Sequence, residues 1–341
     1  MVRKLIITNH KNEQLELDIF QPEKSGLTVR KLTGVGPVQA SITTTDIASG
    51  DGKIFNFARK SERAIDLQLG LMELVYKIKD GYDGSTEKWH WETIEECRHR
   101  VYQYFPLKQK IKFEVITDTR HVYTYGYVEQ NDPDIWSDDE TQDVQILCTN
   151  PYFIDIEQQS FEMSLIDPRF EFPRDENERD ALLQQDQYIA LGLKHSNYDG
   201  GLNDANHPFI FGEYTFDNEF VLDYKGECET GCIFKVSFTG KVEDFQLMDI
   251  TKNEILYIKP ANISSIACFN NGDVLTICTK TGEKKCELLS NSQITNCIGM
   301  IDRGSTWLTF SQGENVFGYS SVSGIQYINI EVIIDPLYEG I

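Results

Sequence analysis

The residues best suited to bind a metal are few and poorly spaced. Cys228 and Cys232 form a close cysteine pair, in the pattern Cys-x3-Cys. A zinc site would need two more ligands at comparable spacing, and the six histidines supply no partner pair. His90 and His99 are nine residues apart, whereas metal-binding helices place two histidines about four residues apart on one face. The sequence therefore predicts no metal site.

A second group of candidates concerns phosphate binding and hydrolysis. The loop containing Gly34, Gly36 and Pro37 lacks the third glycine of a dinucleotide fingerprint, and its proline removes an N–H that a phosphate cradle would donate. Adjacent acids at 138–140 and 175–176 are typical of solvated loops, because glycosidic cleavage requires two carboxylates held apart across a cleft. No Gly-x-Ser-x-Gly elbow is present. We therefore predict neither an enzyme nor a cofactor-binding protein, and a turn at residues 34–37.

The charge balance argues against a protein whose main role is to grip nucleic acid. The 341 residues include 32 Lys plus Arg and 54 Asp plus Glu, for a formal net charge of −22, whereas phosphate binding needs clustered cations. The length favours two domains. No apolar run of about 18 residues predicts a membrane span. The first nine residues are too briefly apolar for a secretory signal, so we expect folding in a cytoplasm with reduced cysteines.

Residues 1–158 are predicted to form the first domain, built mainly from antiparallel strands. Apolar and polar residues alternate with the period of strands that bury one face, over residues 64–69, 111–115 and 122–125. One helix is predicted over residues 86–105, because apolar residues recur there at helical spacing before Pro106. Residues 46–52 are predicted to form a loop, since they are rich in Ser, Gly and Asp.

Residues 126–153 are predicted to form a fixed connector between strands. A strand over residues 122–128 is expected to lead into a turn at Asp132 and Pro133, and a second strand over residues 144–148 to end at Pro151. Proline supplies no N–H and biases the preceding residue away from helix, so we expect both strands to end abruptly. The aromatic residues Trp136, Tyr152 and Phe153 follow these stops. This segment is therefore expected to present a shape to neighbouring surfaces.

The second half of the chain divides into a polar segment and an all-β domain. Residues 159–212 are charged, amide-rich and glycine-rich, and we predict an acidic or polar linker or arm. Residues 213–341 contain short apolar strands separated by turn signals, which suggests a β-sandwich. Strands are expected at 233–238, 273–278, 307–310 and 327–334. Trp307 lies in one of these strands and favours a core position, whereas Tyr319, Tyr327 and Tyr338 fit either a core or an exposed sugar-binding platform.

Short motifs in the chain occur in the order found in one phage protein family. They are Leu-Thr-Gly-Val-Gly-Pro at 32–37, Asp-Gly at 51–52, Tyr-Phe-Pro at 104–106, Arg120 before Gly-Tyr-Val-Glu at 126–129, Pro-Asp-Ile-Trp-Ser at 133–137 and Pro-Tyr-Phe at 151–153. With these motifs the sequence resembles the distal tail protein family (Dit) of long-tailed phages, mostly those that infect Gram-positive bacteria. The second half resembles the family more loosely, at 226–231, 271–273 and 313–315.

The resemblance implies a fold, an assembly and a set of contact residues. The fold would be mainly β, with two antiparallel β-sandwich domains, the first carrying one α-helix and an extended hairpin and the second galectin-like. The assembly would be a homo-hexameric ring around the channel through which DNA passes, located at the virion tail tip and made in the bacterial host cytoplasm. No sequence-specific nucleic-acid binding is implied.

The implied partners are the tail tube protein, the tape-measure protein, a tail-associated lysin or tip protein and a receptor-binding protein. Residues expected to contact neighbours are Asp51, Gly52, Pro133, Asp134, Ile135, Trp136, Tyr152 and Phe153. Two alternatives come from other classes. One is a carbohydrate-binding adhesin that recognises cell-wall glycan through the C-terminal sandwich, and the weaker one is a hydrolytic tail enzyme.

Overall fold

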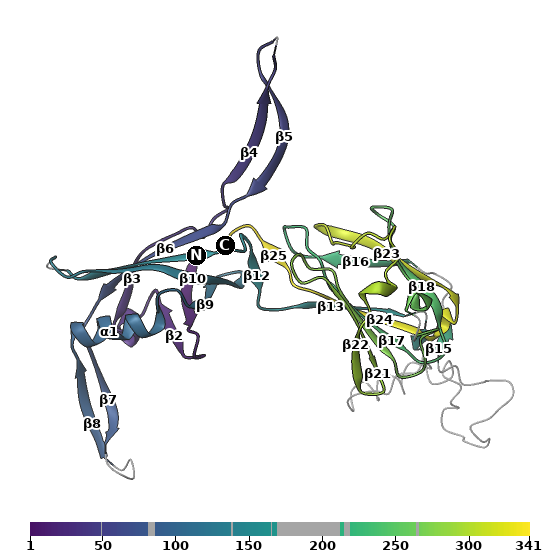
Figure 1. Ribbon diagram of the computed structural model, residues 1–341. Coiled ribbons are helices and arrows are strands. Elements are labelled where there is room, and N and C mark those ends of the chain that lie inside the picture. Colours follow the sequence, from purple (N-terminus) through teal and green to yellow (C-terminus); the bar gives the residue numbers. More distant parts are fainter. Residues whose placement is uncertain are drawn as a thin grey trace, which may run out of the picture. The chain divides into compact units, whose positions relative to one another are not determined.

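The chain forms two compact units (Figure 1). The computed structural model describes residues 1–48, 50–80, 86–137, 139–164, 166–168, 212–214, 219–263 and 266–341. Unit 1 comprises Met1–Gln158, Lys225–Glu229 and Asp335–Ile341, and unit 2 comprises Gln159–Tyr224 and Thr230–Ile334. Most of the predicted 159–212 linker lies outside the described residues, so its role stays a prediction.

Unit 1 is built around one antiparallel sheet in the order β2-β1-β9-β10-β11-β6-β3, with β12 paired to β10 and β25 paired to β12. Two further hairpins, β4–β5 and β7–β8, form their own two-stranded sheets. The elements are β1 Val2–Thr8, β2 Gln14–Asp18, the 3-10 turn Pro22–Lys24, β3 Leu27–Thr33, β4 Ala40–Asp46, β5 Lys53–Lys60, β6 Arg63–Leu71, β7 Leu74–Asp80, β8 Thr86–Glu92, α1 Ile94–Tyr104, β9 Lys110–Thr117, β10 His121–Asp134, β11 Thr141–Cys148, β12 Phe153–Asp155 and β25 Leu337–Tyr338.

The core of unit 1 follows from the alternation of apolar and polar residues along its strands. In β9, for example, Ile111, Phe113 and Val115 are fully buried, because successive side chains of a strand point to opposite faces. Cys97 and Val101 of α1 join the same buried cluster. The strand pattern predicted for this part of the chain is therefore confirmed.

The helix begins later than the sequence predicts. Residues 86–92 form strand β8 and only Ile94–Tyr104 is helical, so the prediction of one helix over residues 86–105 was wrong in its first third. Thr93 supplies the physical reason. Its side chain accepts a hydrogen bond from the Glu96 N–H, and the Glu96 carboxylate accepts one from the Thr93 N–H. This capping box starts a helix at Ile94.

Strand β10 does not stop at Asp132 and Pro133, where the sequence predicts a turn. It continues to Asp134, with Pro133 opposite Gln142 of β11. The pairing of β10 with β9 ends at Tyr127, so beyond that residue β10 has a neighbouring strand on one side. Proline is tolerated on such an edge because the missing N–H need not break a ladder. The turn of the hairpin lies between Asp134 and Thr141.

Unit 2 is a sandwich of two antiparallel sheets. A six-stranded sheet has the order β13-β24-β17-β20-β21-β22 and a four-stranded sheet the order β16-β23-β18-β19. The elements are β13 Gln159–Ser164, β14 Ile166–Pro168, β15 Gly212–Tyr214, β16 Glu219–Tyr224, β17 Ile233–Phe238, β18 Glu243–Asp249, β19 Glu254–Ile258, 3-10 turn Pro260–Asn262, β20 Val274–Cys278, β21 Lys285–Ser290, β22 Gln293–Asn296, 3-10 turns Ile298–Met300 and Ile325–Tyr327, β23 Gly313–Ser323 and β24 Ile328–Ile334.

Aromatic side chains fill the space between the two sheets of unit 2. Phe238 of β17 stacks on Phe269 with ring centroids 4.3 Å apart and meets Phe245 of β18 at 5.9 Å. These contacts join the inner faces of the two sheets, as in β-sandwiches generally. The segment 307–310, predicted as a strand, forms only an isolated bridge between Phe310 and Thr230. The apolar residues Leu308 and Phe310 of this segment are buried in the core of unit 2, although the segment is not a strand of either sheet.

The predicted fold class is confirmed. The described residues form mainly antiparallel β-structure, with one α-helix and an extended hairpin in unit 1. The galectin-like character of unit 2 stays a prediction. None of the helices in the described residues is long and apolar enough to cross a membrane.

Candidate assembly surfaces

The described residues do not gather the groups that a metal site would need. No cluster of three or more His, Cys, Asp or Glu side chains in these residues could hold a metal ion. Burial raises the pKa of Cys148 to about 11 and that of Cys286 to about 12. A thiol with such a pKa stays protonated near neutral pH and is a poor nucleophile. The features that stand out instead are exposed hairpins.

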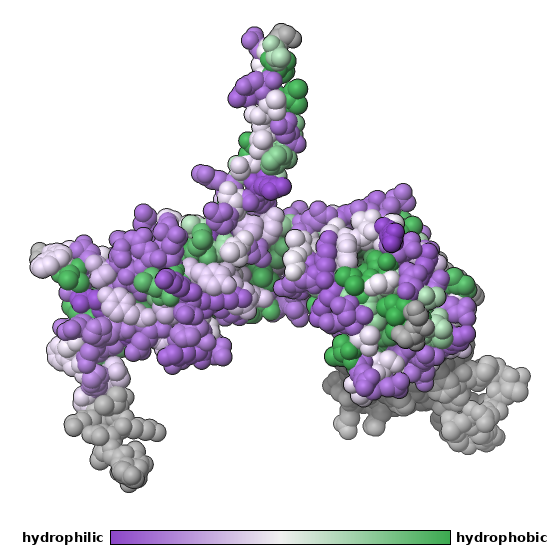
Figure 2. Space-filling view, viewed as in Figure 1, coloured by the Kyte–Doolittle hydropathy of each residue, from purple (hydrophilic) through white to green (hydrophobic). Residues whose placement is uncertain are grey.

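The β4–β5 hairpin, which we call the arm (residues 40–60), lies outside the core of its own unit. Figure 1 shows it as a two-stranded ribbon that extends away from the sheet of unit 1. Apart from Thr43, every described arm residue is exposed, and Figure 2 shows hydrophobic residues in green along its length. The exposed apolar side chains are Ile42, Ile47, Ile54, Phe55 and Phe57. An isolated two-stranded hairpin is marginally stable in water, and exposed apolar residues gathered on such an element make the arm a candidate interaction surface.

A buried arginine at the start of β6 fixes the root of the arm, by which we mean residues 34–37 before β4 and residues 60–63 after it. Arg63 is 1% exposed and donates hydrogen bonds to four backbone carbonyls. Its Nη1 donates to the carbonyls of Gly34 and Gly36, the second at 2.7 Å. Nε and Nη2 both donate to the Pro151 carbonyl, at 2.9 and 2.6 Å. Nη2 also donates to the Glu339 carbonyl at 2.6 Å. The guanidinium also lies 4.3 Å from the centroid of the Phe153 ring. Desolvation lowers the pKa of Arg63, but an arginine stays charged in proteins.

The backbone turn before the arm requires glycine. Gly34 has a φ of +80°, and a Cβ built on it would lie 1.8 Å from the carbonyl oxygen of Ala64. Residues 34–37 therefore form the predicted turn, but the turn leads into the arm and its carbonyls hold a guanidinium rather than a phosphate.

A second set of contacts joins the root of the arm to residues 335–341. Lys60, the last residue of β5, forms an ion pair with Glu339 and lies 4.7 Å from the centroid of the Tyr152 ring. This ion pair holds the pKa of Glu339 below its usual value. The N–H of Ile341 donates to the Val35 carbonyl at 3.2 Å. The turn before the arm and the strand end after it are thus both fixed to the same segment.

The C-terminal strand of unit 1 is itself firmly docked. β25 pairs with β12, and the Tyr338 hydroxyl donates to Asp155 at 2.9 Å. Burial and this bond to a carboxylate raise the pKa of Tyr338 to about 12. The Arg120 guanidinium stacks 4.3 Å from the Tyr338 ring centroid and forms an ion pair with Glu227.

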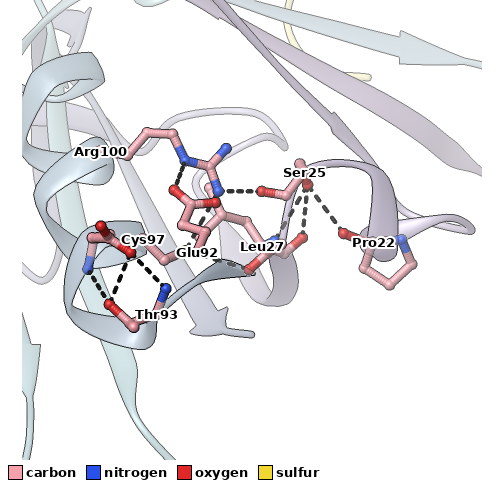
Figure 3. A network of polar contacts seen from close by, with 9 residues as sticks. Pro22, Ser25, Leu27, Glu92, Thr93, Cys97 and Arg100 are labelled. Carbon is pink, nitrogen blue, oxygen red and sulfur yellow. Dashed lines mark hydrogen bonds and ion pairs between the residues drawn. The ribbon is translucent and has the colours of Figure 1, made fainter. Parts of the chain in front are cut away.

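The β7–β8 hairpin has an arginine at its root as well (Figure 3). Glu92, the last residue of β8, is buried and accepts a hydrogen bond from Arg100 Nε of α1 at 2.9 Å, while Arg100 Nη2 donates to the Ser25 carbonyl. Further along the hairpin, Trp89 and Trp91 are 67% and 61% exposed. Both residues fall in the range 86–105 that the sequence predicts as a helix, whereas the structure places them in strand β8. Within unit 1 they lie on the surface.

The end of the β10–β11 hairpin is acidic and carries an exposed tryptophan. We call residues 129–143 the acidic hairpin tip. It contains seven Asp or Glu and no Lys or Arg. Asp132 and Asp143 lie directly opposite each other across the two strands, an arrangement of like charges that destabilises a strand pair. Trp136, in the turn, is 92% exposed and Ile135 beside it is also exposed.

The structure separates the predicted contact residues into three places. Asp51 and Gly52 lie in the loop at the far end of the arm, and Pro133, Asp134, Ile135 and Trp136 lie in the acidic hairpin tip; all six are exposed. Tyr152 is half-buried at the arm root. Phe153 is fully buried beneath Arg63, and therefore belongs to the core of unit 1 rather than to a contact surface.

Sequence reasoning missed Arg63, Lys60 and Glu339 as the residues that hold the arm, and Trp89 and Trp91 as exposed hairpin residues. A signal for the last two exists, since they alternate with His90 at strand spacing. No sequence signal links Lys60 or Arg63 to Glu339, which lies 276 residues beyond Arg63.

The aromatic residues considered for sugar binding are mostly buried. Tyr319 and Tyr338 are buried, and Trp307 packs against the core of unit 2. Tyr327 is exposed. The sequence favoured a core position for Trp307, which agrees with this packing.

The arrangement of an antiparallel unit with one helix and an extended hairpin, together with a second antiparallel sandwich, is a fold found in a solved phage protein. The crystal structure of SPP1 Dit shares this fold, with a TM-score of 0.58 and 7% sequence identity over 97% of this chain and 98% of that chain. SPP1 Dit is described as a paradigm of the hub adsorption apparatus in phages that infect Gram-positive bacteria.

Two structures of the phage P2 baseplate in its activated conformation align over 98% of both chains. Their TM-scores are 0.43 with calcium and 0.40 with strontium, at 12% and 11% identity. No family model and no curated protein sequence matched the chain.

Proposed function

We propose that this protein is a structural component of a phage tail tip, a hub that joins the tail tube to the host-adsorption apparatus. The observation that carries the proposal is the shared fold with SPP1 Dit across nearly the full length of both chains. The protein would act through its surfaces, without making or breaking a bond. The arm supports this role, because it exposes apolar side chains on an element that contributes nothing to the core of its own unit.

Assembly would produce a closed homo-hexameric ring, the number of copies being the one that the family resemblance implies. In such a ring each copy presents one surface to the neighbour on one side and a different surface to the neighbour on the other side. Unit 1 carries the exposed hairpins suited to these contacts, and unit 2 would serve as a docking platform for further tail proteins. The expected partners are the tail tube, tape-measure, tip and receptor-binding proteins, and the place of action is the virion tail tip.

The charge of the chain sets a condition on ring closure. Each copy carries a formal charge of −22, so the copies repel one another at long range unless salt screens them. Ring formation should therefore depend on ionic strength, and the contacting surfaces should combine both signs of charge.

The test is the mass and shape of the purified full chain. Multi-angle light scattering at low and at near-physiological salt is expected to show a hexamer in at least one condition, and negative-stain images a six-lobed ring. A glycan array tests the adhesin alternative on the same sample. A monomer at every salt concentration and protein concentration, with or without glycan binding, would refute the hub.

A further inference from the structure

Two buried cysteines face each other across the last hairpin of the six-stranded sheet in unit 2. Cys286 lies in β21, and Cys297 follows directly after β22. The register pairs Glu287 with Asn296, so the next position on each strand brings Cys286 opposite Cys297. The Cys297 N–H donates to the Cys286 carbonyl at 2.7 Å, as this register requires. Opposite residues of an antiparallel pair share a face, and both cysteines are fully buried in the core of unit 2.

The backbone spacing at this position suits a disulfide. Opposite Cα atoms of an antiparallel pair lie about 4.5–5.5 Å apart, and disulfides join residues whose Cα atoms are about 4.4–6.8 Å apart. The opposite Cβ atoms must approach by about 1 Å for the bond to form. β22 can supply this movement, because it lies at the edge of the sheet and all its residues are exposed.

The other buried cysteines of these strands lack this relation. Cys278 of β20 lies opposite Ile233 and Lys285, so it is one residue out of register with both Cys232 and Cys286. A shift of one residue along a strand places a side chain on the other face of the sheet. The geometry therefore singles out Cys286 and Cys297 as a pair.

The strand that would be cross-linked is the least supported one of its sheet. β22 is short and exposed, and Ile294 within it is an exposed apolar residue. Exposed edge strands open locally and can pair with other chains. A covalent bond at the base of the hairpin would hold β22 in the sheet and limit both events.

Burial keeps the two thiols unreactive while β22 stays in place. Desolvation raises the pKa of Cys286 to about 12 and also raises the pKa of Cys297. A cysteine in water has a pKa of about 8.5, so local opening of the edge hairpin returns both thiols to ordinary reactivity. Oxidation of the pair therefore follows opening of the hairpin.

We propose that Cys286 and Cys297 form a disulfide when the chain meets an oxidising environment, and that this bond staples the edge hairpin to the core of unit 2. In a reducing cytoplasm the pair stays as two thiols. The pairing itself does not depend on the proposed hub. Its timing rests on that function, because a virion component leaves the cytoplasm in which it is made.

The reaction is thiol–disulfide exchange with a small disulfide such as oxidised glutathione. One protein thiolate attacks a sulfur of the oxidant, whose S–S bond breaks, and the first reduced glutathione leaves. The second protein thiolate attacks the protein sulfur of the mixed disulfide, which forms the Cys286–Cys297 bond and releases the second glutathione. The two protein sulfurs give up two electrons to the glutathione sulfurs, and both thiol protons end on reduced glutathione.

Mass spectrometry of the full chain tests the pairing. Trypsin cleaves after Lys285 and Arg303, so both cysteines lie in one peptide, 286–303. The natural chain is incubated with oxidised glutathione, unfolded, treated with N-ethylmaleimide and digested. Peptide 286–303 is expected to be two hydrogens lighter than its reduced form and to carry no N-ethylmaleimide. The buried cysteines Cys97 and Cys148 are expected to carry the label in the same sample.

Thermal unfolding tests the staple. Oxidation is expected to raise the melting temperature of unit 2 by roughly 5–15 °C. A chain with Cys286→Ala and Cys297→Ala should show no change on oxidation. The matched control with Cys232→Ala and Cys278→Ala removes two other buried thiols of the same sheet and should still form the bond.

The outcomes are read on the natural chain and do not depend on the variants folding. If Cys286 and Cys297 both carry N-ethylmaleimide after oxidation, or if either of them joins another cysteine instead, the pairing is refuted. A bond that forms without raising the melting temperature refutes the staple. Each of these results leaves the proposed hub standing, because the hub is tested by assembly.

Discussion

Replacing Arg63 by methionine should loosen the root of the arm and destabilise unit 1. Methionine keeps much of the aliphatic bulk but leaves the carbonyls of Gly34, Gly36, Pro151 and Glu339 without the donors that they have now. An unpaired buried polar group costs about 1–3 kcal/mol, and four carbonyls lose a donor in this variant, although the variant no longer keeps a charged guanidinium out of water. We expect a loss of about 3–5 kcal/mol, which for a unit of this size lowers the melting temperature by roughly 6–20 °C.

Hydrogen exchange monitored by mass spectrometry separates the two units in the full chain. Faster exchange is expected in the residues tied to Arg63, at 33–37, 151–155 and 337–341, and unchanged exchange in β17 and β24 of unit 2. Arg59→Met is the matched control, because Arg59 is exposed on the arm and its loss should change stability by no more than about 0.5 kcal/mol. If Arg63→Met costs under 1 kcal/mol and leaves exchange at the arm root unchanged, the role assigned to Arg63 is wrong.

Three further predictions concern other contacts. Glu92→Gln removes the charged partner of Arg100 and should lower the free energy of unfolding, measured by chemical denaturation, by about 1–3 kcal/mol. The control Glu95→Gln, on the exposed first turn of α1, should lower it by less than about 0.5 kcal/mol. Equal effects of the two substitutions would contradict the prediction. Phe269→Ala removes a fully buried ring stacked on Phe238 and should lower the stability of unit 2 by about 3–5 kcal/mol, with Phe55→Ala on the arm as the neutral control. Tyr338→Phe should cost about 1 kcal/mol at pH 7, and the difference from the natural chain should shrink as the pH rises from 10 to 12. The pKa of Tyr338 is about 12 in the folded state and about 10 in the unfolded chain. Between pH 10 and 12 the unfolded chain therefore loses the Tyr338 proton while the folded state keeps it, so the natural chain becomes less stable as the pH rises. A stability difference that widens above pH 10 would refute the assignment.

Local patterns in the sequence predicted individual strands well and their lengths less well. The strand predicted from the alternation over residues 111–115 lies within β9, where Ile111, Phe113 and Val115 pack into the core of unit 1. The helix start was wrong because helical spacing of four apolar residues was extended over Trp89 and Trp91, which belong to a strand. The prediction that β10 ends at Pro133 was wrong, because a proline stops a strand only where a neighbouring strand needs the N–H that proline lacks.

The exposed hairpins show why a site of this kind is only partly visible in a sequence. Asp51, Gly52 and residues 133–136 were predicted to contact neighbours, and they lie exposed at the ends of two hairpins. Phe153 was placed with them because it is aromatic and follows a proline, yet it lies under Arg63 in the core. Whether an aromatic side chain faces solvent or a guanidinium depends on segments far away in the chain.

The sequence by itself determined the β-rich architecture, the absence of motifs for catalysis and the strongly negative charge, because alternation, motif spacing and charge are local or additive properties. Only the tertiary structure decided which residues hold the arm. Arg63 meets Gly34, Pro151 and Glu339 solely because the strand containing Leu337 and Tyr338 returns to unit 1 and pairs with β12. Contacts between residues so distant in the chain form through the folded core, and no local spacing records them.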